Sequence, residues 1–501
     1  MRVPAPKKYY QHLMSMLCQL MLISSIAGCV SMAPKYERPP LPVAATFPNY
    51  TDNSASLSTP DGAAMAVASS ADNSSAAAIQ WQEYFVDQQL QKLITTALHN
   101  NRDLRSTLSR VEAARALYGI QRAEQFPTVA VGADGTRSRV PSDLSITGYP
   151  LVSGEYQVGL GVSSWELDLW GRVRSLKEAA LEKYLATDAA RRAVTVNLIA
   201  QVANSYLTLR ELDERLTLAR QTIDSRQESL RIFRRRVEVG STSSLDLLQV
   251  ETLWQQAKAL GAQLEQARAL QLHALTLLIG APVDLSPQTV DFNADEVFSE
   301  LRVGLPSDLL LQRPDIVAAE HQLKAANADI GAARALFFPK IALTGSLGTA
   351  SAELDGVFAP GSMAWSLGSN VALPIFDAGR NRSNLQLSAA QRNQALAQYE
   401  KAIQSAFRDV SDALSNRHWL TDQVQTLQAM RAAQAERARL AKMRYDNGAA
   451  AFLEVLDAQR DLLGVEQQLV QTRRALLSSH VNLYAALGGG AQHLDADEAI
   501  K

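Results

Sequence analysis

Long parts of the chain carry apolar residues at helical spacing. Residues 168–239 contain no proline, and apolar side chains recur there at steps of three, four or seven positions. The recurring positions are Leu198, Val202, Leu209, Leu212, Leu216, Ala219 and Ile223. This pattern predicts one very long helix, on the order of 100 Å at a rise of ~1.5 Å per residue.

A second helical stretch near the C-terminus has a seven-residue repeat. Its large apolar positions are Val455, Leu462, Leu469, Leu476 and Leu483, and small or apolar residues follow three positions later, at Ala458, Val465, Thr472, Ser479 and Ala486. The pattern is typical of a coiled-coil seam, and its small partners permit close helix approach. A weaker series occurs at Leu253, Leu260, Ala267 and Ala274. An ordinary antiparallel helical bundle would show the same periodicity.

Two other segments alternate between apolar and polar residues, as strands do. Tyr156, Val158, Leu160 and Val162 alternate in the first segment; Ile341, Leu343 and Leu347, then Trp365, Leu367, Val371 and Leu373, do so in the second. Each segment predicts a β-hairpin, at about 127–165 and 339–376, with strands long enough to cross an outer membrane. Aromatic residues flank the strands and would suit a membrane interface, although core packing explains any single one: Phe126, Trp165, Phe337, Phe338 and Phe376.

Matched landmarks indicate that the chain is an internal duplication. RAEQFPTVAVGA from Arg122 resembles RALFFPKIALTG from Arg334, and two glycine pairs share an offset of 208 residues: Gly171 with Gly379, and Gly240 with Gly448. The halves span about 81–290 and 300–490. Each half is predicted to hold a helix, a β-hairpin and two long helices, the latter at about 168–239 and 243–280, then 377–446 and 450–487.

Four membrane strands in one chain would form an open sheet. Its edges would expose unpaired backbone groups to lipid, at a cost of several kcal/mol each. The chain must therefore oligomerise. Two copies would give an eight-stranded barrel, whose interior side chains largely fill. Three copies would give a twelve-stranded barrel with room for a lumen. We therefore predict a homotrimer whose long helices extend the same cylinder into the periplasm.

The N-terminus predicts export and lipidation. Residues 1–28 carry Arg2, Lys7 and Lys8 and then a mostly apolar run, the layout of a secretory signal peptide. The run ends in IAGC, so a lipoprotein peptidase would expose Cys29 as the lipid-bearing, palmitoylated N-terminus. The alternative is an ordinary signal peptide with a chance cysteine. Residues 44–78 are rich in Ala, Ser, Asn and Asp and poor in large apolar groups, and the lipidated segment 29–80 is expected to run extended along the body; the tail 491–501 is expected to be mobile.

Composition then excludes several functions. The only other cysteine, Cys18, lies in the leader, so the processed chain offers no thiol for a disulfide, a nucleophile or a zinc site. Without the three basic residues of the leader, 46 of the 49 Lys and Arg remain against 51 Asp and Glu, a net charge of −5 that argues against nucleic acid as a partner. After the leader no run of 18 apolar residues occurs, so any membrane crossing would use strands. No catalytic, metal or nucleotide-binding pattern is found, and we expect no enzyme activity and no cofactor.

The two helix-to-helix turns are marked by Gly240 and Gly448, because glycine tolerates the left-handed conformation that ends a helix. Ser243 and Asp246 predict a capping box after the first turn. The second turn reads GAAAF from Gly448, which leaves the next helix without an obvious N-cap. Both turns should lie at the periplasmic tip, since the other helix ends lead to the strands.

These landmarks resemble the TolC-like outer-membrane factors and, within them, the lipidated OprM-like branch that serves multidrug efflux pumps. The resemblance covers nearly all of the mature chain. Besides the lipobox at Cys29 it rests on SMAPKYERP from Ser31, NNRDLR from Asn100, WELDLWGRVR from Trp165, QRPDIVAAEHQLKAANADIGAARALFFPKI from Gln312, LPIFDAGRNR from Leu373 and LDAQRDLL from Leu456.

The resemblance implies a mainly α fold with a membrane β-barrel portion: a homotrimer with a shared 12-stranded barrel and a 12-helix periplasmic tunnel. It implies a passive duct in the outer membrane that exports drugs or other small toxic compounds. The implied partners are a periplasmic adaptor, an inner-membrane pump of the RND type and outer-membrane lipid.

In the OprM-like branch the second turn lines the closed aperture, and the matching residues are Leu453 and Asp457. Three leucines would close a ring by apolar contact, whereas three carboxylates would repel one another and narrow the pore, select cations or bind one. Arg444 and Tyr445 match positions that help hold the tip shut. From the residues alone, a solvated helix position paired with Arg460 is the favoured interpretation of Asp457, and the resemblance reverses this preference.

Two rival functions remain. One is the outer duct of a type I protein secretion system or of a heavy-metal pump. Clusters of methionine or histidine along the predicted tunnel would favour the metal pump, and none is found there. The other is a lipoprotein coiled-coil scaffold without a pore, which heat-modifiable trimers and bilayer conductance would exclude.

Overall fold

The computed structural model describes residues 31–44, 46–47, 79–285, 297–298 and 313–491. The predicted signal peptide, Cys29 and nearly all of the tail lie outside the described residues. The chain divides into two compact units, and each unit combines matched segments of both sequence halves. In the first unit these are Val111–Thr187 and Ala319–Tyr399, which begin 208 residues apart. The compact units therefore do not coincide with the halves at 81–290 and 300–490, because elements of the two halves pair side by side.

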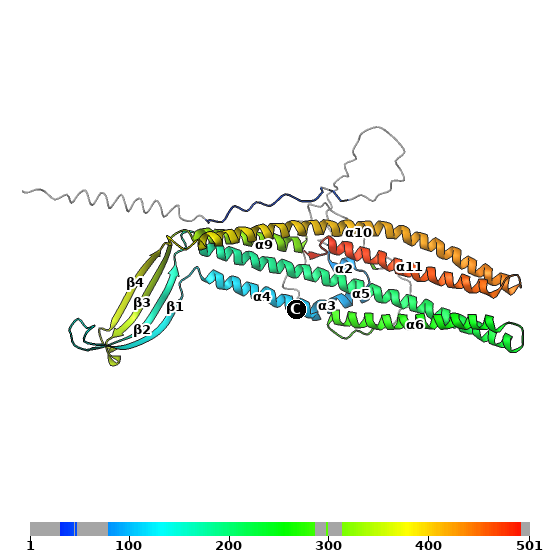
Figure 1. The fold of residues 1–501 in the computed structure, drawn as a ribbon, viewed down its shortest axis with the longest axis horizontal. Coiled ribbons are helices and arrows are strands. Elements are labelled where there is room, and N and C mark those ends of the chain that lie inside the picture. The colour runs from blue at the N-terminus through cyan, green and yellow to red at the C-terminus, as the bar shows by residue number, and fades with distance from the viewer. Residues whose placement is uncertain (1–30, 45, 48–78, 286–296, 299–312, 492–501) are drawn as a thin grey trace, which may run out of the picture. The chain divides into compact units, whose positions relative to one another are not determined.

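The first unit contains one four-stranded antiparallel sheet in the order β1-β2-β3-β4 (Figure 1). Its strands are β1 (Val129–Val140), β2 (Leu151–Glu166), β3 (Lys340–Ser351) and β4 (Met363–Ala372). The central pair, β2 with β3, joins the two sequence halves through nine paired positions and a bulge between Val162 and Trp165. The two predicted hairpins thus lie in a single sheet, with β1 and β4 at its edges.

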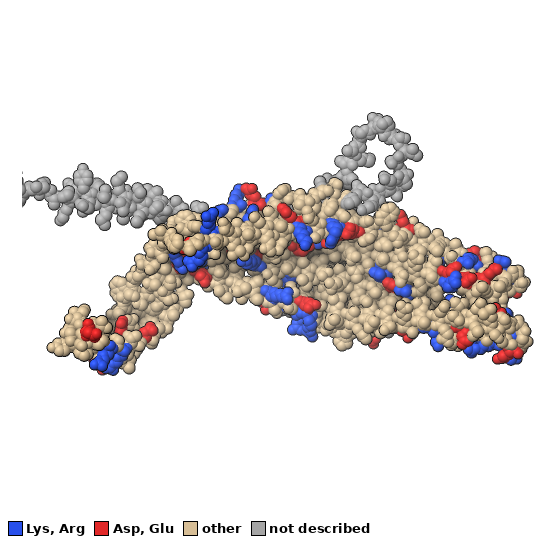
Figure 2. All heavy atoms as spheres, in the orientation of Figure 1, with Lys and Arg blue, Asp and Glu red and all other residues tan. Residues whose placement is uncertain are grey.

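The two faces of this sheet differ in chemistry. On one face, register brings Val131, Leu160, Leu347 and Trp365 into one row across all four strands, and these side chains are 47% to 77% exposed. Residues one position away face the opposite side and are small or polar: Ser346 and Ser366, for example, join their hydroxyls at 2.7 Å. In Figure 2 the middle of the sheet shows no charged side chain. An exposed apolar face backed by a small, polar one is typical of strands between lipid and a lumen.

Aromatic side chains mark the places where helices give way to strands. Phe126 follows α4 (Arg102–Ala123), and Phe337 and Phe338 follow α9 (Pro314–Ala335). These three rings are 37% to 65% exposed, and Phe376 is 89% exposed. Trp165 is more sheltered, and its indole N–H donates to the Gln125 carbonyl at 3.3 Å.

The second unit is helical and contains most of two long hairpins, whose first helices begin within the first unit (Figure 1). The first pairs α5 (Arg172–Glu238) with α6 (Ser244–Ile279), and the second pairs α10 (Arg380–Asp446) with α11 (Phe452–Ala486). Two shorter helices, α2 (Trp81–Tyr84) and α3 (Gln88–Asn100), precede α4. Of the helices in the described residues, none combines the length and the apolar character needed to span a bilayer.

The long helices α5 and α10 begin a few residues after the predicted starts at 168 and 377, because the aspartates at those positions cap them. Asp168 accepts from the backbone N–H groups of Val173 and Arg174 at 3.1 and 2.8 Å. Asp377 accepts from that of Asn381 at 2.9 Å. A carboxylate that satisfies free N–H groups at a helix N-terminus must precede the helix rather than lie within it.

The predicted seams hold the hairpins together. In the second hairpin, Val424 and Leu427 of α10 pack on Leu469 of α11. In the first, one apolar cluster joins the two helices and consists of Leu212, Leu216, Ala219 and Leu264. The weaker series of α6 ends early, since Ala274 is exposed and Leu275 is buried instead. The predicted fold class, mainly α with antiparallel strands in a duplicated chain, is confirmed.

Candidate functional site

The tips of the two hairpins end in the same turn. Gly240 and Gly448 both have φ of +73°, and nothing would lie within 4 Å of a Cβ added at either glycine. In the first tip the N–H groups of Gly240 and Ser241 donate to the carbonyls of Val237 and Arg236 at 3.0 and 2.8 Å. This pair of backbone hydrogen bonds defines a Schellman motif. The backbone conformation, and not crowding, therefore requires glycine at this turn.

The second tip repeats the motif. The N–H groups of Gly448 and Ala449 donate to the carbonyls of Tyr445 and Arg444 at 2.9 and 2.8 Å. The predicted residues Arg444 and Tyr445 are thus the two positions whose carbonyls end α10. Their side chains remain free to act on other elements.

The helices that follow the two turns begin differently. At the start of α6 the Ser243 hydroxyl accepts from the Asp246 N–H, and the Asp246 carboxylate accepts from the Ser243 N–H and from Thr242, which completes the predicted capping box. The Ser243 hydroxyl also donates to this carboxylate at 2.7 Å, and this bond, with those from Thr242 and the Ser243 N–H, lowers the pKa of Asp246. At the start of α11, Ala451 occupies the N-cap position and supplies no side-chain acceptor. The predicted lack of an N-cap at the second tip is confirmed.

The second tip is held instead by arginine. The Arg444 guanidinium donates to the Glu454 carboxylate at 3.0 Å and to the Ala449 carbonyl at 3.3 Å, so one side chain bridges the turn and the first turn of α11. Both partners of the ion pair are about half exposed. A pair of this exposure contributes little on its own, roughly 0–1 kcal/mol.

Aromatic rings join the two tips to each other. The Phe452 ring lies 4.6 Å from that of Phe233 on α5 and 4.9 Å from that of Tyr445 on α10, between ring centroids. Arg236 of α5 donates to the Tyr445 hydroxyl, and its guanidinium lies 5.6 Å from the centre of that ring. Leu456 continues this contact into a small apolar cluster with Leu230, Phe233 and Val250. Helix α11 therefore begins in contact with the other hairpin.

Leu453 and Asp457 lie one turn apart on a face of α11 that points away from this packing. Leu453 is 49% exposed, whereas Val455 and Leu456 beside it are buried. The Asp457 carboxylate pairs with Arg460 at 3.1 Å and is 40% exposed. The protomer thus contains the Asp457–Arg460 ion pair that is expected of a solvated helix position. The side chains of Leu453 and Asp457 also remain exposed enough to contact other copies of the chain.

The Asp457 pair belongs to a larger charge network. Arg460 also binds Asp461 at 3.1 Å, and Asp461 binds Arg437 of α10 at 2.8 Å; the two arginines lower the pKa of Asp461. Arg226 of α5 is buried beside Arg460 and donates to the Leu253 carbonyl at 2.6 Å. Burial and then the nearby Arg460 charge lower the pKa of Arg226. The carboxylates of α11 therefore offset a like-charge contact between the hairpins.

The sequence did not single out Arg226, Phe233, Arg236, Phe452 or Glu454. One signal was available, because Arg236 precedes Gly240 by four residues as Arg444 precedes Gly448. Which tip residues contact each other follows only from the packing. Charged side chains crowd both tips in Figure 2.

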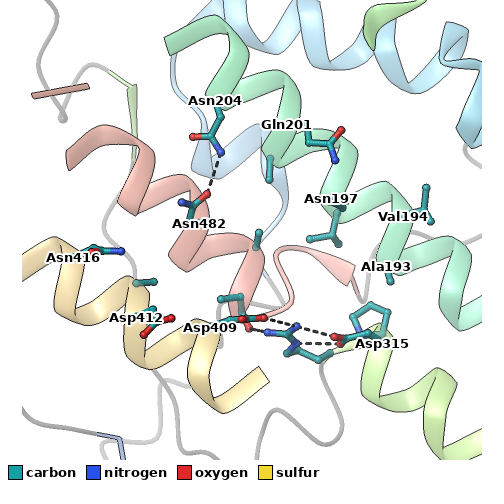
Figure 3. A pocket seen from close by; sticks show the side chains of 17 residues that line it. Ala193, Val194, Asn197, Gln201, Asn204, Asp315, Asp409, Asp412, Asn416 and Asn482 are labelled. Atoms are coloured by element: carbon teal, nitrogen blue, oxygen red, sulfur yellow. Dashed lines mark hydrogen bonds and ion pairs between the residues drawn. The ribbon is translucent and has the colours of Figure 1, made fainter. Parts of the chain in front are cut away.

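A polar cavity of about 610 Å³ lies farther along the second unit. It is lined by α5, α10, the end of α11 and the start of α9, and five amide side chains face it (Figure 3): Asn197, Gln201, Asn204, Asn416 and Asn482. Arg313 at its edge is held by Asp315 at 2.7 Å and by Asp409 at 3.3 Å. A third aspartate, Asp412, also lines the cavity, so the wall carries three carboxylates against one guanidinium. Among the described residues, no group of three or more His, Cys, Asp or Glu is placed to hold a metal ion.

The family model described as outer membrane efflux protein matches residues 93–281 and 305–489, one match in each sequence half. The chain therefore belongs to the outer membrane efflux protein family, and the resemblance to the TolC-like factors is confirmed.

Relatives match almost the whole chain. The toluene efflux pump outer membrane protein TtgC of Pseudomonas putida is 42% identical over 476 residues, 95% of each chain. The outer membrane protein OprJ of Pseudomonas aeruginosa is 42% identical over 478 residues, covering 94% of this chain and 95% of its own. The open-state outer membrane channel MtrE of Neisseria gonorrhoeae is 38% identical with a TM-score of 0.79, covering 92% of this chain and 99% of that one.

Proposed function

We propose that three copies of this chain close one β-barrel and one helical tunnel, and that the trimer is the passive outer-membrane duct of a tripartite efflux system for drugs or other small toxic compounds. The observation that carries the proposal is the four-stranded sheet with one exposed apolar face and one small, polar face. A sheet with these faces suits lipid on one side and water on the other. The relatives named as efflux pump proteins support the same role.

The sheet edges support the trimer. Strands β1 and β4 end the strand order, so each has one side without a partner in the sheet of this chain. In lipid those backbone groups require partners. Three protomers satisfy them by pairing β4 of one copy with β1 of the next, and twelve strands enclose a lumen that eight would fill with side chains.

The second hairpin tip is the proposed aperture. Leu453 and Asp457 share an exposed face of α11, which supports one ring of each around the trimer axis. A periplasmic adaptor and an inner-membrane pump of the RND type would open this tip and supply the energy. Arg444 and Tyr445 would hold it shut through Glu454 and Arg236.

Cys29 is proposed as the lipid-bearing residue of the mature chain, on the lipobox sequence IAGC. Metabolic labelling with palmitate would mark the wild-type chain and leave Cys29→Ser unlabelled. Equal labelling of both chains would contradict this assignment.

The face assignment has a direct test with two neighbouring residues. Leu347 lies on the apolar face and Ser346 on the other, so Leu347→Arg should cost about 2–4 kcal/mol in the membrane and abolish heat-modifiable trimers. Ser346→Arg should keep the trimers and shift ion selectivity in planar bilayers towards anions. Trimers of equal yield and unchanged selectivity in both variants would contradict the assignment of one face to lipid and the other to the lumen. Absence of conductance from the wild-type protein would contradict the channel function itself.

The aperture has a separate test. Asp457→Ala removes a carboxylate ring, so single-channel conductance should rise and any block by divalent cations should weaken, because fewer charges would crowd the axis. Glu466→Ala is the matched control, since Glu466 lies further along the same helix and is paired with Arg431. If Asp457→Ala leaves both quantities unchanged, Asp457 is not part of the aperture.

A further inference from the structure

A short segment near the N-terminus, residues 32–38, lies along helix α9 within the first unit (Figure 1). We call this segment the strap. Its backbone is held by helix side chains: Arg334 donates to the Met32 carbonyl at 3.1 Å, and Asn327 donates to the Pro34 carbonyl at 2.6 Å. An extended segment of this length is ordered only if such contacts offset its loss of conformational entropy.

The C-terminal end of the strap is fixed by a carboxylate. Arg38 donates to both oxygens of Glu320, at 3.0 and 2.8 Å, and Tyr36 donates its hydroxyl to the same carboxylate at 3.2 Å. Lys324, one turn along α9, binds Glu320 at 3.2 Å and lies 5.3 Å from the centre of the Tyr36 ring. The Glu320 side chain is only 6% exposed. Burial by itself would raise the pKa of Glu320, but the bonds from Arg38 and Lys324 outweigh it and lower the pKa.

The strap, at Ala33, lies directly against Gly331 of α9. A Cβ added at Gly331 would lie 2.7 Å from the Ala33 backbone nitrogen and 2.8 Å from the Ala33 Cβ, and 2.7 Å from the Ser175 hydroxyl. The strap backbone therefore approaches α9 as closely as a helix without a side chain permits. Glycine destabilises a helix interior by about 1 kcal/mol relative to alanine. The close approach of the strap explains why a glycine occupies position 331.

The N-terminal end of the strap lies at the junction between helix and strand. Arg334, which binds Met32, is the penultimate residue of α9, and β3 begins at Lys340. Phe337 and Phe338, in the connection, are partly exposed. Cys29 precedes Met32 by three residues, a chain length of at most about 11 Å.

We infer that the strap is a docking element that fixes the lipid-bearing N-terminus at the level where the membrane strands begin, with Glu320 and Gly331 as the residues that receive it. This inference rests on the proposed lipidation of Cys29. A docked strap shortens the free tether between lipid and strands to three residues. A shorter tether raises the effective concentration of the strands at the membrane surface.

The strap contains a natural probe of its own docking. Lys35 and Arg38 are the only basic residues in 29–80, and Arg38 precedes a proline that blocks trypsin, so trypsin can cut this region only after Lys35. Cleavage requires the strap to leave α9 and releases residues 29–35 with any lipid they carry. The rate of release, followed by mass spectrometry on the intact detergent-solubilised protein, therefore reports undocking.

Gly331→Ala should speed this cleavage by about tenfold, because proteolysis follows the population of the open form. Gly119→Ala is the matched control: Gly119 lies in helix α4, and nothing would lie within 4 Å of its added Cβ. Its rate should equal that of the wild type. Equal rates in all three proteins would overturn the docking of the strap on Gly331.

Glu320→Gln should also speed cleavage, whereas Asp329→Asn, on the same helix but paired with Lys183, should not. The double variant Arg38→Gln with Glu320→Gln should be cleaved no faster than Glu320→Gln alone, since the two residues act as a pair. Fully additive effects would overturn the pairing as the basis of docking.

The position of the N-terminus is tested by distances. Spin labels at Ser31→Cys and Lys340→Cys, in protein reconstituted into vesicles, should give a narrow distance distribution in the wild type and in Gly119→Ala, and a broad one in Gly331→Ala. The mass of the released peptide distinguishes lipidation of Cys29 from docking of the strap. A peptide without an acyl chain overturns lipidation of Cys29 and the anchoring role with it, whereas an acylated peptide released equally fast from every variant overturns the strap alone.

Discussion

The two hairpin tips share one turn but differ in how the next helix begins. Both turns end α5 and α10 with a left-handed glycine and the same pair of backbone hydrogen bonds. Helix α6 then starts with a capping box, which is complete within four residues. Helix α11 starts at Ala451 without a side-chain cap and depends on Arg444 and on the ring of Phe452.

This difference separates local from tertiary stabilisation. The capping hydrogen bonds of the first tip come from its own turn and involve no residue of the other hairpin. The second tip depends on Arg444 and Tyr445 of its own hairpin and also on Phe233 of the other hairpin. The duplicated chain thus has one tip with a local side-chain cap and one without, and the second tip carries the proposed aperture residues Leu453 and Asp457.

The largest expected effect is at Phe452. Phe452→Ala removes ring contacts with Phe233 and Tyr445 and should destabilise the start of α11 by about 2 kcal/mol, less than a fully buried ring would because the side chain is only partly buried. Hydrogen exchange of the amides at the start of α11 measures the loss. Exchange at the start of α6 should stay unchanged; equal acceleration at both tips would contradict the independence of the first tip.

A smaller effect is expected from moving the cap between tips. Ser243→Ala should destabilise the start of α6 by about 1 kcal/mol. Ala451→Ser places a serine three residues before Glu454, the spacing of a capping box, and should stabilise the start of α11 by roughly 0.5–1 kcal/mol. Hydrogen exchange at each helix start again reports the change. If Ala451→Ser leaves exchange at α11 unchanged, the missing cap is not what distinguishes the tips.

The smallest expected effect depends on pH. The capping hydrogen bonds lower the pKa of Asp246 in the folded tip, so their contribution is present above the unfolded value of about 3.9 and is lost as pH falls through the lower folded value. Exchange at the start of α6, corrected for its intrinsic pH dependence, should accelerate below about pH 4. Asp246→Asn should remove this acceleration, and its persistence in that variant would assign the pH dependence to another group.

Much of the fold could be predicted because it is local. The periodicity of the seam at Val455, Leu469 and Leu483, the turn glycines and the Ser243 capping box can each be recognised from neighbours within a few residues. The helix starts were placed a few residues early, since Asp168 and Asp377 were included in the helices that they cap. The halves of the sequence did not predict the compact units, because strand pairing and helix packing join residues from both halves.

The sequence alone determined the duplication, the hairpins, their turn chemistry and the alternation of the strands, because periodicity and capping are properties of a continuous stretch of chain. Only the tertiary structure decided that Arg236 meets Tyr445 across 209 residues, that β2 pairs with β3, and that Arg38 binds Glu320 across 282 residues. Such contacts depend on which faces of distant segments fit together. The composition of each segment restricts that choice but leaves the partner open.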